Sequence, residues 1–209
     1  MLVSLLLPLI PLLASSLPLP LPRRALLSAS LLPLLPLLPS PSSAYPIAAS
    51  EPDLRATFRL AQASRAPAIL WLGCGDLSGA YKDLFKPGAS VVALDLVAPS
   101  PPALAAAAEH LRARGVALSF VRGDAAALPF APASFDCALC SMFLCQDFDP
   151  SVVVSGVRRV LREGGRFGFF EHVENIDEVI VPVFGERSIV RIQHAPKLSN
   201  IMAGVVAKV

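Results

Sequence analysis

The sequence predicts an α/β domain, in which a doubly wound, mainly parallel sheet is covered by helices on both faces. From residue 68 onward, short apolar runs alternate with segments of helical character, which is the pattern of βαβ units. Polar residues stand at or just after the ends of these runs: Asp76, Asp95, Asp124 and Glu171. Parallel sheets bind ligands at the carboxyl ends of their strands, so we expect a binding site at this edge.

Seven apolar runs are predicted to be strands, and two segments are predicted to be helices. The strands are expected at residues 68–72, 89–96, 116–124, 134–144, 166–173, 187–195 and 200–209. The helix over 102–115 is rich in alanine, begins with proline and ends at glycine. The helix over 150–165 begins with proline and is expected to stop at its terminal glycine pair.

The first fifty residues differ from the rest of the chain. They contain no Asp, Glu or Lys, their only charges are Arg23 and Arg24, and Leu, Pro, Ser and Ala dominate. The sequence therefore predicts a Leu/Pro-rich targeting leader over 1–50 and a single domain over 51–209. The domain has about 160 residues, which is long enough for one hydrophobic core.

The leader has the layout of a transit or export signal. Residues 1–22 carry no charge but contain several prolines, and these make a spanning helix unfavourable. Arg23 and Arg24 precede a second apolar run that ends in small residues near Ala44, as in a twin-arginine signal with its cleavage site. This arrangement favours a chloroplast address with a later thylakoid step. An endoplasmic-reticulum signal-anchor, or another membrane-associating segment, is the alternative.

Charge and cysteine content exclude two classes of function. The chain has 18 basic and 16 acidic side chains, and the two leader arginines account for the excess, so no basic surface for nucleic acid is expected. Cys137, Cys140 and Cys145 are spaced by three and five residues, which does not match a paired zinc site. We expect these thiols and Cys74 to be reduced and buried, as small apolar groups, and we expect no metal.

The stretch ILWLGCGDLSG predicts a ligand-binding turn. Gly73 and Gly75 follow an apolar run, and without Cβ atoms they allow a ligand close to the backbone. Asp95 lies 20 residues beyond Gly75, where a carboxylate can accept both hydroxyls of a ribose. Asp124 can accept a hydrogen bond from the adenine amino group. Together they predict an adenosine-containing ligand; a tight turn and two helix N-caps are the alternative.

Two adenosine ligands compete for this site. A nicotinamide dinucleotide requires a third glycine for its pyrophosphate, but Ser78 occupies that position, and no Tyr-x-x-x-Lys pair is evident. S-adenosylmethionine has no phosphate and makes no such demand. The sequence therefore favours S-adenosylmethionine, and a nucleotide-dependent oxidoreductase remains the weaker alternative.

Four sequence blocks carry a resemblance to a known family. The blocks ILWLGCGDLSG, VVALDL, GDAAALPFAPASFDCALCSMFL and VRRVLREGGRFGFFEHV resemble class I S-adenosylmethionine-dependent methyltransferases with a type 11 methyltransferase domain. These include the quinone-biosynthesis C-methyltransferases. The last block and the tail RIQHAPKLSNIMAGVVAKV are most similar to the methyltransferase-like thiol methyltransferases and their plant relatives. The resemblance covers residues 68–209.

The resemblance implies a Rossmann-like, doubly wound sheet of seven strands with an antiparallel last strand. It implies S-adenosylmethionine as cofactor and a small, hydrophobic acceptor: a thiol, a phenol or a quinone-like molecule. It also implies eight cofactor-binding positions: Gly73, Cys74 and Gly75 at the methionine part, Asp95 at the ribose, Leu96, Asp124 and Ala125 at the adenine, and Ser141 beside the sulfonium. No catalytic residue is assigned; His172 is a candidate base, with a structural role as the alternative.

Three departures from the family pattern bear on activity. Trp71 replaces a usual acidic residue, and Leu77 replaces a usual glycine. The segment between strands five and six, residues 174–188, is shorter than the helical segment that helps the family to enclose its acceptor; Pro182 limits its apolar part to a short helix or an extended run. We therefore expect cofactor binding to survive better than catalysis. A non-catalytic binding or scaffold protein derived from a methyltransferase is the alternative function.

Overall fold

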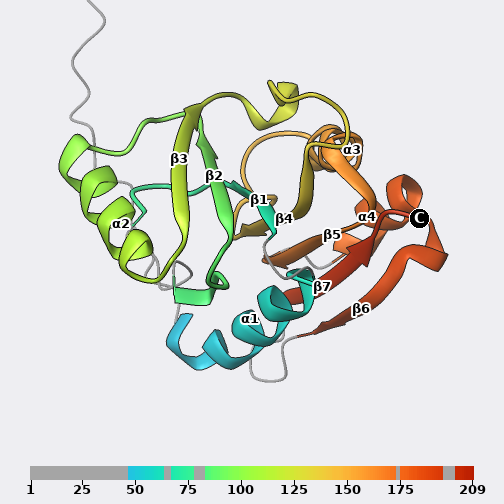
Figure 1. Cartoon of the computed structure of the whole chain (residues 1–209). Coiled ribbons are helices and arrows are strands. Elements are labelled where there is room, and N and C mark those ends of the chain that lie inside the picture. Colours follow the sequence, from blue (N-terminus) through green and yellow to red (C-terminus); the bar gives the residue numbers. More distant parts are fainter. Residues whose placement is uncertain (1–46, 64–66, 78–82, 173–174, 195–200) are drawn as a thin grey trace, which may run out of the picture. The chain divides into compact units, whose positions relative to one another are not determined.

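The computed structural model describes residues 47–63, 67–77, 83–172, 175–194 and 201–209. Most of the predicted leader, including Arg23, Arg24 and Ala44, and also Ser78, lies outside the described residues. The helices are α1 Ile47–Ala61, α2 Pro101–Ala113, α3 Pro150–Val160 and α4 Ile176–Phe184, with 3-10 turns η2 Ala125–Ala127 and η3 Glu186–Ser188. The strands are β1 Ala68–Leu72, β2 Ser90–Asp95, β3 Ala117–Arg122, β4 Phe135–Ser141, β5 Leu161–Glu171, β6 Ile189–His194 and β7 Met202–Ala207 (Figure 1).

The described strands form one seven-stranded sheet in the order β3-β2-β1-β4-β5-β7-β6. Strands β1 to β5 are paired in parallel, and β7 lies antiparallel between β5 and β6. The predicted doubly wound sheet with an antiparallel last strand is therefore confirmed. The strand order reverses between β1 and β4, so the ligand edge of such a sheet is at the carboxyl ends of β1, β2 and β4.

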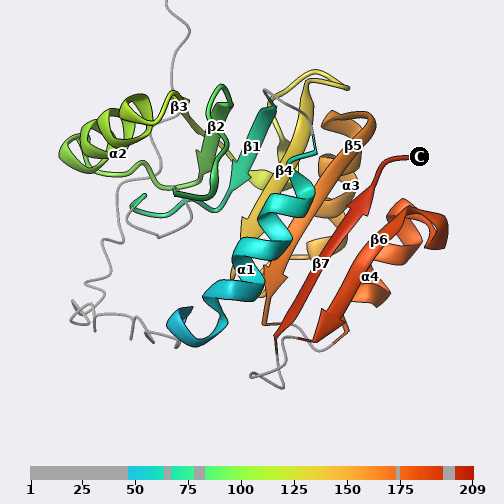
Figure 2. The same cartoon turned by 60° about the horizontal axis from the view of Figure 1, so that its bottom comes forward.

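Helices cover both faces of the sheet because the side chains of each strand alternate between two apolar layers. Ile69 and Trp71 of β1 belong to the layer that includes residues of α1 and α2. Leu70 and Leu72 belong to the opposite layer, with residues of α3 and α4. Figure 2 shows α1 lying across one face of the central strands, while α3 and α4 lie behind the sheet.

Helix α1 was not predicted, and it begins at Ile47, inside the range assigned to the leader. Leu54, Phe58 and Ala61 are buried at helical spacing, so the signal was present in the sequence. The end of α3 was also predicted wrongly. The helix stops at Val160, and the glycine pair lies inside β5, where the register against β4 shifts. Gly164 has a φ of +72°, a left-handed conformation that glycine adopts readily and that allows the irregular pairing within the strand.

The short segment between β5 and β6 forms α4, a nine-residue helix. Ile176, Ile180 and Phe184 are buried along one side, and they join the apolar layer of α3. The segment thus takes the short-helix form, and it packs against the sheet rather than over its ligand edge. Within the described ranges, no helix is both long and apolar enough to cross a bilayer.

Candidate functional site

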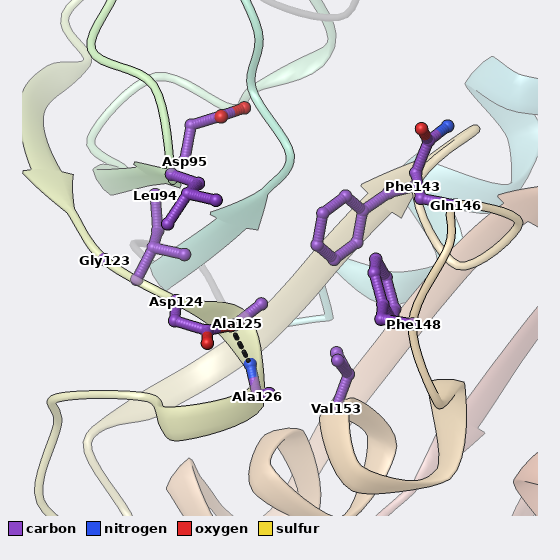
Figure 3. A pocket seen from close by; sticks show the side chains of 11 residues that line it. Leu94, Asp95, Gly123, Asp124, Ala125, Ala126, Phe143, Gln146, Phe148 and Val153 are labelled. Atoms are coloured by element: carbon purple, nitrogen blue, oxygen red, sulfur yellow. Dashed lines mark hydrogen bonds between the residues drawn. The ribbon is translucent and has the colours of Figure 1, made fainter. Parts of the chain in front are cut away.

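A cavity of about 260 Å³ opens at the carboxyl ends of β2 and β3. Its lining comes from these strand ends, from η2, from the loop after β4 and from the start of α3: Leu94, Asp95, Leu96, Gly123, Asp124, Ala125, Ala126, Phe143, Gln146, Phe148 and Val153. In Figure 3, the aromatic rings and Val153 lie across the cavity from Leu94, Gly123 and Ala125. Four of the eight predicted positions line this cavity: Asp95, Leu96, Asp124 and Ala125.

Asp95 connects the glycine turn to the end of β2. Its Oδ2 accepts a hydrogen bond of 2.9 Å from the Gly75 N–H, and its Oδ1 accepts one of 3.0 Å from the Val97 N–H. A carboxylate offers about four acceptor positions, and these backbone contacts use two of them. Asp95 can therefore hold the turn and still accept hydrogen bonds from a diol.

Asp124 follows β3, the strand next to β2 in the sheet. Its Oδ1 accepts a hydrogen bond of 2.8 Å from the Ala126 N–H, which makes it the N-cap of η2 (Figure 3). The N-cap alternative thus describes a contact that Asp124 makes, and the same side chain lines the cavity. Because capping uses one oxygen, the other remains able to accept from a ligand.

The glycine turn adopts the backbone conformation that its sequence predicts. Gly73 and Gly75 have φ values of +62° and +54°, which favour glycine. Leu77 also has a φ of +62°, so the position where the family usually carries glycine is left-handed here as well. The Cys74 side chain is buried, and this burial raises the pKa of its thiol to about 12, with Asp95 as a second cause. Cys74 can therefore offer a ligand only its backbone.

Phe143 lies between the glycine turn and the cavity. A Cβ placed on Gly73 would be 2.7 Å from Cγ and 3.0 Å from Cβ of Phe143, so the phenyl group covers this glycine directly. A Cβ on Gly75 would meet no atom of the described residues within 4 Å. The lining of the cavity includes none of Gly73, Cys74, Gly75 and Ser141. Phe143 thus covers Gly73 of the predicted methionine end and also lines the cavity at the predicted adenosine end.

Glu171, at the end of β5, holds the loop that carries Phe143. Its carboxylate is fully buried and accepts hydrogen bonds from the Phe143 N–H at 2.9 Å and the Leu144 N–H at 3.0 Å. Burial raises the pKa of Glu171 to about 7, although the Cys140 thiol and the backbone N–H groups of the loop act in the opposite direction. Sequence inspection placed Glu171 at a strand end but did not detect this role.

The remaining titratable candidates lie away from the cavity. His172 is not among the residues that line it. His110, which is exposed on α2, forms a hydrogen bond with the side chain of Asp83. Cys137 and Cys140 are free and buried as predicted, but Cys145 is exposed, so the prediction of burial is wrong for Cys145. It follows β4 in the loop, beyond the buried strand. No cluster of three metal-binding side chains occurs in the part of the chain that the structure describes.

Comparison with known proteins identifies the family. A model described as a methyltransferase domain matches residues 70–169. The human (Homo sapiens) thiol S-methyltransferase TMT1B is 32% identical over 181 residues, covering 81% of this chain and 72% of that protein. The demethylmenaquinone methyltransferase of Thermus thermophilus is 36% identical over 99 residues, or 47% of this chain. The chain spans only 43% of the length of that bacterial relative.

Solved structures share the fold. The N-methyltransferase NodS from Bradyrhizobium japonicum has a TM-score of 0.58 at 15% identity, covering 78% of this chain and 99% of its own. A Burkholderia thailandensis 1,6-didemethyltoxoflavin-N1-methyltransferase has a TM-score of 0.56 at 18% identity, covering 78% and 80%. The sheet order, the domain match and the human relative agree. The chain therefore belongs to the class I methyltransferases, whose methyl donor is S-adenosylmethionine.

Proposed function

We propose that this chain transfers the methyl group of S-adenosylmethionine to a small, hydrophobic acceptor, with an alkyl or aryl thiol as the first choice. The observation that carries the choice is the alignment with the human thiol S-methyltransferase, which extends over 181 residues. The bacterial relative named for demethylmenaquinone aligns over a shorter stretch. Quinone-like and phenolic acceptors are therefore the alternatives to a thiol.

Residues for both ends of the cofactor are present, and Phe143 covers Gly73 at the methionine end. Among the described residues, no atom would lie within 4 Å of a Cβ on Gly75, so the methionine part can approach the backbone of the turn there. Asp95 has acceptor capacity for the ribose hydroxyls, and Leu96 is largely exposed beside it, where it can cover one face of the adenine. Asp124 and Ala125 would meet the adenine edge. Ser141 ends β4 and would lie near the sulfonium.

Little chemistry is required from the protein itself. The cofactor supplies a methyl group already activated on a sulfonium, so the chain's task is to align two reactants and exclude water. A thiol has a pKa near 8.5 and is partly ionised at mildly alkaline pH, which removes the need for a strong base. The titratable side chains that line the cavity are Asp95 and Asp124, and both are assigned to the adenosine. The aromatic rings opposite them supply an apolar wall.

The expectation of slow transfer rests on the segment between β5 and β6. No described residue of the 174–188 segment lines the cavity, because α4 packs into the apolar layer with α3. Misplacement of a reactant by about 1 Å can lower a rate on the order of 100-fold. A cofactor-binding protein that does not catalyse transfer is therefore the second candidate function.

The test is methyl transfer from S-adenosylmethionine to a panel of alkyl thiols, phenols and a demethylated quinone. The chain is compared with a chimera that carries a full-length segment between β5 and β6 from a relative. We expect slow transfer to thiols by the chain and faster transfer by the chimera. Equal rates would contradict the role given to this segment. Transfer to the quinone alone would show that the acceptor is a quinone and not a thiol.

The leader assignment is part of the proposal. Residues 1–50 would direct the domain over 51–209 to the chloroplast, with cleavage near Ala44, and the apolar leader would associate with membranes before cleavage. A fluorescent fusion of residues 1–50 should label chloroplasts. Labelling of the endoplasmic reticulum would overturn this address, and loss of a later thylakoid step on replacing both Arg23 and Arg24 by Lys would support the twin-arginine signal.

A further inference from the structure

We infer that Phe143 is a side-chain gate that closes the methionine end of the cofactor site and must swing away for the whole cofactor to bind. The inference rests on the proposed cofactor site. Its first basis is the contact already described, in which the phenyl group covers Gly73 so closely that a Cβ there would lie 2.7 Å from its Cγ. A ligand that approaches the backbone of Gly73 needs this space.

The second basis is that the backbone beneath the ring is fixed. The Phe143 and Leu144 N–H groups donate to the buried Glu171 carboxylate, and the Met142 N–H donates to the Phe170 carbonyl at 2.9 Å. Met142 has a φ of +53°, which a non-glycine residue adopts at a cost unless its surroundings impose it. Moving the loop would break these bonds. Rotation of the phenyl group about its own side-chain bonds would not.

The third basis is the free space beside the ring. Phe143 is half-buried, and its ring faces the cavity (Figure 3), with the Phe148 ring at 5.1 Å between centroids and 46° between planes. The cavity measures about 260 Å³, slightly below the range of about 300–1,000 Å³ usual for ligand sites. Rotation of the ring away from Gly73 would extend this cavity toward Gly73 and lengthen the site.

The closed ring should affect one part of the ligand only. The adenosine part would enter the cavity on the side of Asp95 and Asp124, which the ring leaves accessible. The amino-acid tail would need the open form. When a binding-competent form is populated to only a fraction, the apparent affinity falls by that fraction. With an open population of roughly 10%, removing the ring should strengthen binding of the complete ligand about tenfold.

The experiment measures binding to the full chain by calorimetry with two ligands. S-adenosylhomocysteine carries the amino-acid tail, and 5′-methylthioadenosine lacks it. Phe143→Ala should bind S-adenosylhomocysteine roughly 5–10-fold more tightly than the unmutated chain, with 5′-methylthioadenosine changed less than about twofold. Phe143→Leu should fall between the two. The matched control is Phe148→Ala, which removes the other ring from the same cavity and should change the affinity for both ligands by a similar factor.

Three outcomes decide the matter. A gain confined to the ligand with the tail supports the gate. Unchanged or weaker binding of S-adenosylhomocysteine by Phe143→Ala and Phe143→Leu, both with the circular dichroism of the folded chain, would overturn it, because the ring would then be a fixed wall or a contact of the bound ligand. Absence of binding by every form would overturn the proposed cofactor site, and the gate with it.

Discussion

Replacing the buried carboxyl of Glu171 by an amide should remove a pH dependence of folding. Burial raises the pKa of Glu171 from 4.5 to about 7. The folded-state pKa lies above the unfolded value, so the stability that this group contributes is full below pH 4.5 and is lost as the pH rises through 7. Each pH unit between the two values changes the free energy of unfolding by about 1.4 kcal/mol. The loss should total about 3 kcal/mol.

The measurement is urea unfolding followed by circular dichroism at half-unit steps from pH 4.5 to 8. Burial raises the pKa of the neighbouring Cys140 thiol well above 9.0. Partial desolvation and the charge of Glu171 also raise the pKa of the more exposed Cys145 thiol above 9.0, so both thiols stay neutral in this window. Glu171→Gln cannot ionise but keeps one acceptor oxygen for the loop N–H groups. The difference in free energy of unfolding between the unmutated chain and this variant should therefore change by about 3 kcal/mol across the window.

The matched control is Glu178→Gln, which changes an exposed acid on α4. The difference in free energy of unfolding between this variant and the unmutated chain should stay constant across the window within about 0.5 kcal/mol, as is usual for surface positions. If the free energies of unfolding of the unmutated chain and of Glu171→Gln change with pH in parallel, Glu171 does not titrate in this window, and the account of its burial is wrong.

Three further predictions concern single residues. Leu77→Gly should be more stable than Leu77→Ala by about 1 kcal/mol in urea unfolding, because the left-handed φ of +62° strains any residue with a Cβ; a more stable Ala variant would contradict this. Gln62→Leu should lose about 2–4 kcal/mol of unfolding free energy, since its buried amide bonds to the Leu84 carbonyl and the Lys86 N–H; a loss below 1 kcal/mol would count against it. Iodoacetamide should modify Cys145 alone in the folded chain, because Cys74, Cys137 and Cys140 are buried; mass spectrometry showing modification at any of these three would contradict their burial.

Local patterns predicted most of the fold. The seven strands follow apolar runs whose ends carry polar residues, and the helix over 102–115 has both of its terminal signals in the sequence. The end of α3 was misplaced because Gly164 and Gly165 can stop a helix or accommodate an irregular strand, and pairing with β4 decides between these. Helix α1 was missed because elements were predicted only from residue 68 onward, although most of the helix lies inside the predicted domain.

The site was predictable where it depends on strand ends and not where it depends on packing. Asp95 and Asp124 lie at or just after the ends of apolar runs. The topology of a parallel sheet therefore brings both residues to one cavity. The contact of Phe143 with Gly73 joins residues far apart in the chain, and no periodicity encodes it. The same is true of Glu171, whose partners are backbone N–H groups of another loop. The aromatic residues after β4 were visible in the sequence, but their orientation was not.

Binding of S-adenosylhomocysteine to the full chain and to Asp95→Ala tests the central claim most directly. The account predicts saturable binding at one site by calorimetry. It also predicts that Asp95→Ala weakens this binding by roughly 1.5–3 kcal/mol, because charged hydrogen bonds to the ribose are lost. Asp149→Ala is the matched control, since Asp149 is exposed and caps α3 outside the lining of the cavity, and it should leave the affinity unchanged. No binding by the unmutated chain, or equal binding by Asp95→Ala, would contradict the account.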